Sequence, residues 1–347
     1  MSELFLIPTG HIIKDYLEEN NITQKELANR TGMSEKHISN VLRGKKPLTN
    51  DFALKIEKVI PSIKADYWMN YESKYQLDLL RQKEKYSLEN QDLIKLSKRF
   101  RFKEIFKDLN LSVKEQAIEM LKLLKISSFD LFDKNYGNLC VDFMEDGGDK
   151  EAIAIWLNLC ENEIEIQNDD ILDIMYKKEN LINNIYKFKL LLLNDVNNER
   201  SLVSCRKLFN NLGIYFVVYE ANTNCKVRGC LTSYNNHPAI YISRRGKKPS
   251  YIWFAIFHEI SHLILHYSKN ETNIISDIDI TIKESDANIY SRNLLIKENE
   301  YLNFIKRNKF DKESIINFAG KNDIPPSFVV DFLKHDKLID YNQFCYL

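Results

Sequence analysis

The strongest hydrophobic segment of the chain covers residues 250–265. Apolar side chains occupy nearly every face that a helix over this segment would present. A helix that is apolar all round is typical of a position inside a protein core. We therefore predict a buried helix over residues 250–265.

Two shorter segments have the pattern of β-strands. Residues 214–219 and 238–243 are rich in β-branched and aromatic side chains, and polar turns with glycine separate them. The edge of such a small sheet can accept an extended peptide as a further strand. The basic residues after the second segment form either a docking site for acidic segments or a solvated turn: Arg244, Arg245, Lys247 and Lys248.

The N-terminal residues predict short helices with clear start and stop signals. Thr23 and Glu26 have the spacing of a capping box, and Ser34 has the position of an N-cap for a helix that Gly44 ends. Gly32 supplies the turn between these two helices. Two short helices joined by such a turn predict a helix-turn-helix unit.

Weaker helical patterns cover the rest of the chain. Residues 84–107 are rich in charge and poor in apolar periodicity, which is typical of a helical connector. Amphipathic patterns predict helices over residues 112–124, 153–159, 284–295, 315–319 and 328–333. The predicted fold class is mainly α with a small β-sheet (α+β).

The length and charge of the chain limit its organisation. At 347 residues one hydrophobic core is not expected, so we place a helix-turn-helix domain over residues 1–85, a helical connector over 86–190 and a third domain over 191–347. Lys plus Arg and Asp plus Glu number 49 each, so any contact with nucleic acid depends on the local basic cluster at residues 36–46. No segment has the pattern of a secretory signal or a membrane span, and we expect a cytoplasmic protein with no membrane partner.

Six cysteines are dispersed along the chain, namely Cys140, Cys160, Cys205, Cys225, Cys230 and Cys345. Cys225 and Cys230 form the only close pair. Because no second pair or histidine completes a metal site with them, we interpret them as reduced thiols in a hairpin.

The predicted buried helix carries His258, Glu259 and His262. Residues four apart on a helix are separated by about 6 Å along the axis and lie nearly on one face, so both imidazoles can bind one ion. The adjacent Glu259 can then act as general base toward a water molecule. This arrangement is that of a zinc-dependent peptidase. The alternative interpretation is a core helix with two incidental histidines.

A catalytic zinc site needs a third protein ligand. His266 lies about 12 Å along the helix axis from His258, too far to share one ion, so we expect it to act at the helix end. Carboxylates downstream are the candidates. These are Glu284 and Asp286 at the start of the next predicted helix and, more weakly, Asp277 and Asp279 in a loop-like stretch.

The residues Phe257-His-Glu-Ile-Ser-His-Leu-Ile-Leu-His266, followed by Glu284-x-Asp-Ala-Asn288 and Leu294-Leu295, resemble the ImmA/IrrE family of zinc metallopeptidases. The resemblance covers residues 190–335, with a helix and strand at 208–218 and a hairpin at Gly229 and 239–243. It implies a zincin-like C-terminal domain. It also implies that His258, His262 and Glu284 hold Zn²⁺ and that Glu259 is catalytic.

The N-terminal residues Thr23-Gln24, Glu26-Leu27-Ala28, Gly32, Ser34, Ile38-Ser39 and Leu42-x-Gly44 resemble the Xre or phage-repressor type of helix-turn-helix. The resemblance implies that double-stranded DNA is a partner and that Gln24 contacts backbone phosphate. It further implies that one set of residues contacts bases and that a second set contacts phosphates. The first set is Glu35, Lys36, Ser39 and Asn40, and the second is Arg43, Lys45 and Lys46.

The residues that follow, 46–60, 68–71 and 75–78, are similar to HigA-type antitoxins. That resemblance implies a homodimer that represses its own operon and a cognate toxin as a possible partner. The chain is much longer than such an antitoxin, because a second domain follows.

Two functions follow from the combined patterns. In the first, a DNA-binding regulator carries a zinc endopeptidase that selectively cleaves a regulatory protein, either a partner repressor, a toxin or the regulator itself. In the second, the same fold senses a ligand or binds a partner toxin without turnover. Glu259 distinguishes the two, since a domain that only binds does not need a general base beside its ligands.

Overall fold

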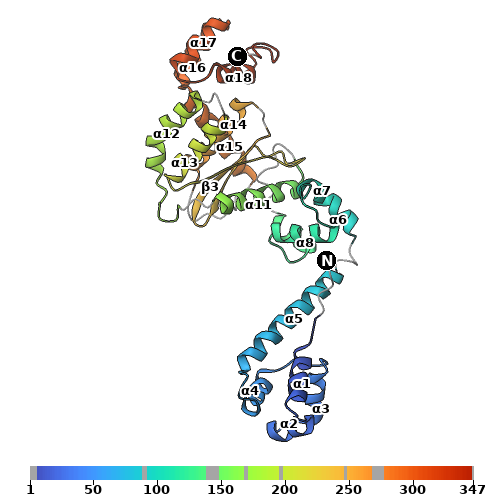
Figure 1. Ribbon diagram of the computed structural model, residues 1–347. Coiled ribbons are helices and arrows are strands. Elements are labelled where there is room, and N and C mark those ends of the chain that lie inside the picture. The colour runs from blue at the N-terminus through green and yellow to red at the C-terminus, as the bar shows by residue number, and fades with distance from the viewer. Residues whose placement is uncertain are drawn as a thin grey trace. The chain divides into compact units, whose positions relative to one another are not determined.

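The computed structural model (Figure 1) describes residues 6–87, 92–137, 148–167, 171–194, 198–245, 248–267 and 277–345. The chain divides into two compact units, Met1–Lys95 and Leu96–Leu347.

The first unit contains helices and no strand among the residues that the structure describes. Its helices are α1 (Thr9–Glu19), α2 (Gln24–Thr31), α3 (Glu35–Leu42), α4 (Asn50–Val59) and α5 (Ala65–Ser87). Their apolar positions meet in one core, formed mainly by Ile13, Leu17, Leu27, Ile38, Val41, Leu42, Phe52, Ile56 and Trp68.

Most of the residues that we expect to start or end helices in this unit do so in the structure. The Ser34 hydroxyl accepts a hydrogen bond from the His37 N–H and begins α3. Gly32 ends α2 in the left-handed conformation, at φ 66°. The capping box at Thr23 forms only in part. The Thr23 hydroxyl accepts from the Glu26 N–H, but the Glu26 carboxylate pairs with Arg30 one turn along α2, because a cation is the stronger partner for it.

The second unit begins with short helices and continues with longer ones before the sheet. These are α6 (Leu93–Arg99, which begins in the first unit), α7 (Phe102–Ile105), α8 (Val113–Leu123), η2 (Phe129–Leu131), α9 (Phe132–Tyr136), α11 (Lys150–Gln167), α12 (Lys178–Leu193) and α13 (Asn198–Asn210). Our boundaries after residues 85 and 190 stay predictions, and they fall within α5 and α12.

The sheet has three strands in the order β1-β3-β2. They are β1 (Tyr215–Tyr219), β2 (Gly229–Tyr234) and β3 (His237–Ser243). The central β3 pairs in parallel with β1 and antiparallel with β2. β3 is buried along its whole length, and its central residues, 238–242, form a continuous apolar run, as is typical of strands that are covered on both faces.

Helices cover both faces of the sheet (Figure 1). Ile240 and Ile242 of β3 face a core that includes α12, α13 and α14 (Pro249–Leu265). Ala239 and Tyr241 alternate to the other face, where they pack against Trp156 of α11. The alternation therefore places α14 and α11 on opposite faces of β3.

Four further helices follow α14 in the described part of the chain. They are α15 (Asp277–Leu295), α16 (Glu298–Lys306), α17 (Lys312–Lys321) and α18 (Pro326–His335). The predicted α+β class is confirmed, with most described residues in helices and one small sheet. Within the described residues, no helix is both long and apolar enough to cross a membrane.

A partly buried ion pair ties α18 to α15. The Arg292 guanidinium donates to both oxygens of Asp336 at 2.9 and 2.7 Å, and the Tyr301 hydroxyl donates to Asp336 Oδ2 at 2.7 Å. The guanidinium carbon lies 4.8 Å from the centroid of the Phe332 ring. Burial alone would raise the pKa of Asp336, but the hydrogen bonds from Arg292 and Tyr301 hold it well below its usual range.

We expect Asp336→Asn to lower the free energy of unfolding by about 2 kcal/mol at pH 7, because charge-assisted bonds are lost. The pKa of Asp336 is depressed in the fold, so its contribution is present above the ordinary value of 3.8 and is lost as the pH falls below it. Urea unfolding of both proteins at pH 7 and below pH 4 measures this difference.

The matched control is Asp340→Asn, because Asp340 is exposed and its carboxylate makes no ion pair with a described residue. This control should unfold like the wild type. Equal stability of Asp336→Asn and the wild type at pH 7 would contradict the role of the ion pair.

Candidate metal centre and nucleic-acid interface

The buried helix α14 brings two imidazoles together. His258 and His262 are one turn apart, and their ring centroids lie 4.6 Å from each other. The two Nε2 atoms are 3.0 Å apart. The helix is fixed in place by a continuous set of buried apolar side chains, namely Ile252, Trp253, Ile256, Phe257, Ile260, Leu263 and Ile264.

Glu284 of α15 completes the group from the neighbouring helix. Its Oε2 atom is 3.1 Å from His258 Nε2, and its Oε1 atom is 3.0 Å from His262 Nε2. In a tetrahedral zinc site, donor atoms at about 2.0–2.2 Å from the ion lie about 3.3 Å from one another. The three side chains therefore fit a metal ion, and they are the metal-ligating group found among the described residues.

Three expectations about α15 are wrong. The helix begins at Asp277, so Glu284 lies two turns inside it and not at its start. Asp286 is accordingly not a first-turn acid, and it is exposed and outside the three-residue group. Asp277 and Asp279 lie within the helix and not in a loop.

The three side chains of the group attract one another strongly. Burial alone would raise the pKa of Glu284, but hydrogen bonds from His258 and His262 bring it well below the usual range. Burial would lower the pKa of His258, but the hydrogen bond to Glu284 and the charges of Glu259 and Glu284 raise it overall. The site thus favours positive charge between Glu284 and the imidazoles, which is what a bound cation provides.

Glu259 has a different environment. It is 5% exposed, and no described side chain forms a hydrogen bond or ion pair with its carboxylate. Burial is the main reason that its pKa is raised. A carboxylate in this state accepts a proton more readily than one in water, which suits a general base.

Gly229, the first residue of β2, leaves the room that Glu259 occupies. A Cβ atom at position 229 would overlap Glu259 Oε1 and would lie 3.0 Å from its Cγ and Cδ atoms. The sequence indicates Gly229 only as part of a hairpin. Its role depends on a contact between residues that are far apart in the chain.

His266 ends α14 and contacts His262. Its Nδ1 atom lies 3.1 Å from Nδ1 of His262, the ring nitrogen that does not face Glu284. Such a bond to the outer nitrogen orients the ring of a metal-binding histidine. Burial and the nearby His262 lower the pKa of His266, and its place at the helix end agrees with our expectation.

The basic residues after β3 are largely used within the fold. Arg244 pairs with Glu199 at 2.7 Å, and Arg245 donates to the Lys226 carbonyl at 2.9 Å. The Lys248 ammonium lies 5.7 Å from the centroid of the Tyr251 ring. Lys247 lies outside the described residues.

The cysteines that the structure describes are free thiols. Cys225 and Cys230 are buried, and burial raises the pKa of Cys225 to about 11. Thiols with so high a pKa are poor nucleophiles and poor metal ligands. Cys140 lies outside the described residues.

The candidate DNA-binding residues lie along α2, α3 and the turn after α3. Glu35 and Lys36 are exposed at the start of α3, whereas Ser39 and Asn40 are half-buried further along it. The Asn40 carbonyl accepts hydrogen bonds from the N–H groups of two turn residues, Lys45 and Lys46. The exposed cations Lys36, Arg43, Lys45 and Lys46 form no ion pair with a described residue.

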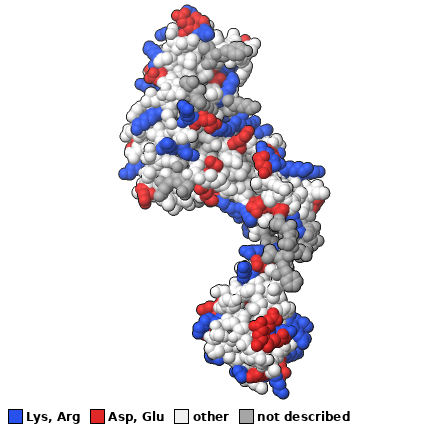
Figure 2. Space-filling model, in the orientation of Figure 1, with Lys and Arg blue, Asp and Glu red and all other residues white. Residues whose placement is uncertain are grey.

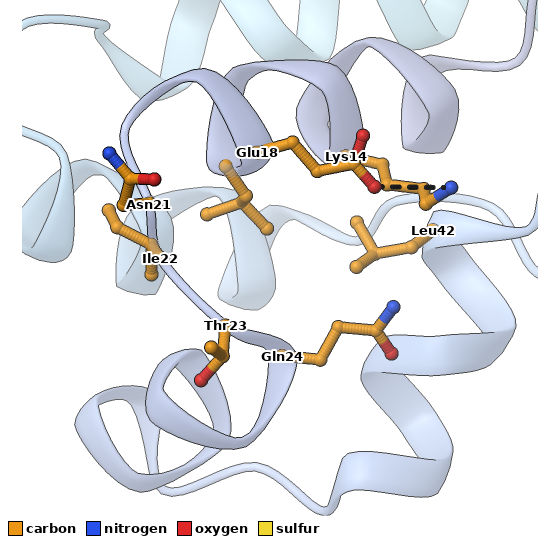
Figure 3. Close-up of a pocket in the computed structure, with 8 residues that line it drawn as sticks. Lys14, Glu18, Asn21, Ile22, Thr23, Gln24 and Leu42 are labelled. Atoms are coloured by element: carbon orange, nitrogen blue, oxygen red, sulfur yellow. Dashed lines mark ion pairs between the residues drawn. The ribbon is translucent and has the colours of Figure 1, made fainter.

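Figure 3 shows the surroundings of Gln24, the first residue of α2. Its side chain lies near Leu42 in a surface pocket that Lys14 and Glu18 also line, and these two form an ion pair at 3.3 Å. The sequence did not indicate Lys14. It comes from α1, and only the packing of α1 beside α2 and α3 brings it near Gln24.

Acidic and basic side chains are interspersed over the face that Figure 2 shows. This agrees with the equal numbers of the two kinds of charge, 49 each. The overall charge therefore provides no general attraction for DNA.

Fold and site together define a chain with a helix-turn-helix unit and a helical zincin-like unit. A helix-turn-helix family model matches residues 13–68. A model described as IrrE N-terminal-like domain, of the peptidase M78 type, matches residues 212–326. The chain thus has an Xre-type helix-turn-helix domain at its N-terminus and an IrrE-like domain at its C-terminus. No curated protein and no solved structure matches the chain at a significant level.

We expect Gly229→Ala to lower the free energy of unfolding by about 1–3 kcal/mol, because the new methyl group overlaps the Glu259 carboxylate. In a Glu259→Ala background the same change should cost at least about 0.5 kcal/mol less, since the overlap is then relieved. Urea unfolding of the four proteins measures this coupling.

Gly320→Ala is the control, because no atom lies within 4 Å of the position that its Cβ would take. This variant should be as stable as the wild type or more so. Equal costs of Gly229→Ala in the two backgrounds would show that Gly229 does not make room for Glu259.

Proposed function

We propose that this protein is a transcriptional regulator of antitoxin type whose C-terminal domain is a zinc-dependent endopeptidase with a regulatory protein as its substrate. The convergence of His258, His262 and Glu284 beside the buried Glu259 is the observation that carries the proposal. The helix-turn-helix domain supplies DNA-binding regulation. Cleavage of the regulatory protein by the second domain would change which partner the regulator binds or which genes are repressed.

Three side chains would hold the metal ion and a fourth would move the proton. Zn²⁺ held by His258, His262 and Glu284 supplies Lewis-acid chemistry, since it lowers the pKa of water and polarises a carbonyl group. The Glu259 carboxylate accepts a proton from the attacking water and delivers it to the leaving amine nitrogen. Its raised pKa suits both transfers.

The sheet supports an extended peptide as substrate. β2 has β3 as its only partner in the described sheet, so its outer edge can pair with a further strand. β2 also packs against α14, which carries the two histidines. A segment added along β2 would therefore run past the metal-binding helix. The buried general base favours cleavage of such a segment over binding without turnover.

For the DNA-binding half, we propose a homodimer that binds the operator of its own operon. Gln24 and the basic residues Arg43, Lys45 and Lys46 would contact phosphates, while Glu35, Lys36, Ser39 and Asn40 would contact bases. The exposed Leu77 and Leu80 on α5 offer apolar surface for a second copy, at 50% and 58% exposure. A cognate toxin or repressor encoded next to the gene is the proposed protein partner and candidate substrate.

We expect the zinc-loaded protein to cleave the product of the neighbouring gene, and Glu259→Gln to cleave it at least about 100-fold more slowly. Zinc content should be the same in both proteins, because Glu259 is not a ligand. Mass spectrometry of the products and metal analysis check the two statements.

Glu313→Gln is the matched control, since Glu313 is exposed on α17 and outside the metal-binding group. It should cleave at the wild-type rate. Full activity of Glu259→Gln would contradict the general base, and zinc binding without cleavage by any of the proteins would favour a sensor.

We expect Asn40→Ala to weaken binding to the gene's own promoter by about tenfold or more and to relax sequence preference, because a base contact is lost. Arg43→Ala should weaken binding to all sequences alike and reduce the dependence on salt, because a phosphate contact is lost. Gel-shift titrations at two salt concentrations measure both effects.

Lys74→Ala is the control, because Lys74 is exposed on α5 and outside the candidate DNA-binding set. It should bind like the wild type. Undiminished specific binding by both Lys36→Ala and Asn40→Ala would contradict the assignment of α3 as the recognition helix.

A further inference from the structure

A second pocket lies in the Leu96–Leu347 unit, at the N-terminal end of α14. His266 is at the other end of this helix. The pocket has a volume of about 420 Å³, within the usual range for small-molecule sites. Most of its lining lies outside residues 212–326, which match the IrrE-like domain. The lining residues are Leu192, Leu193, Lys248, Pro249, Ser250, Pro325, Ser327, Phe328, Val330, Asp331, Lys334, Phe344 and Cys345.

Lys334 is the unusual member of this lining. The residue is 6% exposed, and its ammonium forms no hydrogen bond or ion pair with a described residue. Nζ of Lys334 is not among the buried polar atoms that lack a partner, so the aliphatic part of the side chain is packed while the ammonium reaches the space of the pocket. An anionic group in the pocket would provide the missing partner.

Two helix N-termini add to the attraction for an anion. Lys248 to Ser250 begin α14, and Pro325 to Ser327 begin α18. Neither helix has a side-chain cap or an acidic residue in its first turn. Pro249 and Pro326 have no N–H, and the N–H groups of Tyr251 and Phe328 bond to the carbonyls of Lys248 and Pro325, so the N–H groups of Ser250 and Ser327 are the ones that remain for a ligand in these first turns. Helix N-termini of this kind attract negative charge.

The charges and the apolar part of the lining define the ligand. Two lysines against one carboxylate, that of Asp331, leave a net positive lining, and no ion pair joins Asp331 to Lys334. Phe328, Val330 and Leu192 are buried and apolar. We propose that the pocket binds a small amphipathic anion, in which a carboxylate or phosphate group meets Lys334 and an aliphatic body contacts the apolar wall.

The site is separate from the metal centre and does not depend on the proposed peptidase activity. Pro249 and His258 are nine residues apart on α14, which corresponds to about 13 Å along the helix axis. The pocket therefore touches the metal-binding helix at a distance from its ligands, where a bound molecule leaves the metal centre free.

Isothermal titration of the full chain in EDTA tests the proposal with octanoate, octyl phosphate and the uncharged octanol. We expect saturable binding of at least one of the two anions at one site per chain, and at least about tenfold weaker binding of octanol. The anion that binds with the higher affinity identifies the preferred headgroup as carboxylate or phosphate. No saturable binding of either anion, or equal binding of octanol, would overturn the proposal.

Point variants test whether the anion binds in this pocket. Lys334→Met keeps the aliphatic length but removes the charge and should weaken anion binding about tenfold or more, whereas Lys334→Arg should retain it. Leu193→Trp should block binding, because the larger side chain fills the rim of the pocket. Leu193 is 39% exposed, so this variant still tests the site if Lys334→Met fails to fold. His258→Ala should bind the anion like the wild type. Loss of binding in His258→Ala, or full binding in Leu193→Trp, would overturn the proposal.

Discussion

The pairing of Glu284 with two imidazoles of a buried helix is the interaction on which the rest of the site depends. Apolar side chains pack α14 against the sheet, α12 and α18, so the polar groups that it carries are removed from most of the surrounding water. In such a place a charge is stable only with a partner. Glu284 supplies that partner for His258 and His262, and a cation among the three would satisfy the same attraction. Glu259 is left without a partner on the same helix, and a raised pKa is the result.

The surrounding fold holds this arrangement from three sides. The sheet brings β2 so close to α14 that only a glycine at position 229 leaves room for the Glu259 carboxylate. α15 presents Glu284 from its interior, away from both ends of the helix. The ion pair of Arg292 with Asp336 then fixes α18 to the far part of α15. The helix-turn-helix unit differs, because Lys36, Arg43, Lys45 and Lys46 are exposed and form no ion pair with a described residue, so they are available to exchange water for phosphate.

Local signals made much of this predictable from the sequence. The apolar run of α14, the cap at Ser34 and the β-branched runs of β1 and β3 each act over a few neighbouring residues, and the structure places these elements as expected. The start of α15 was missed because residues 277–282 alternate between polar and apolar side chains, a pattern that does not predict a helix. The overlap of position 229 with Glu259 and the burial of Lys334 join distant segments, so no local pattern could indicate them. The contact of Lys14 with the Gln24 pocket arises in the same way from helix packing.

X-ray absorption at the zinc edge tests the central claim most directly, on protein purified without chelators. The account predicts one zinc ion per chain, with a shell of nitrogen and oxygen atoms at about 2.0–2.2 Å, two imidazoles among them and no sulfur. Glu284→Ala should lose most of the metal, because two histidines remain as the only protein ligands. A zinc shell containing cysteine sulfur, or wild-type protein that retains no stoichiometric zinc, would contradict the account.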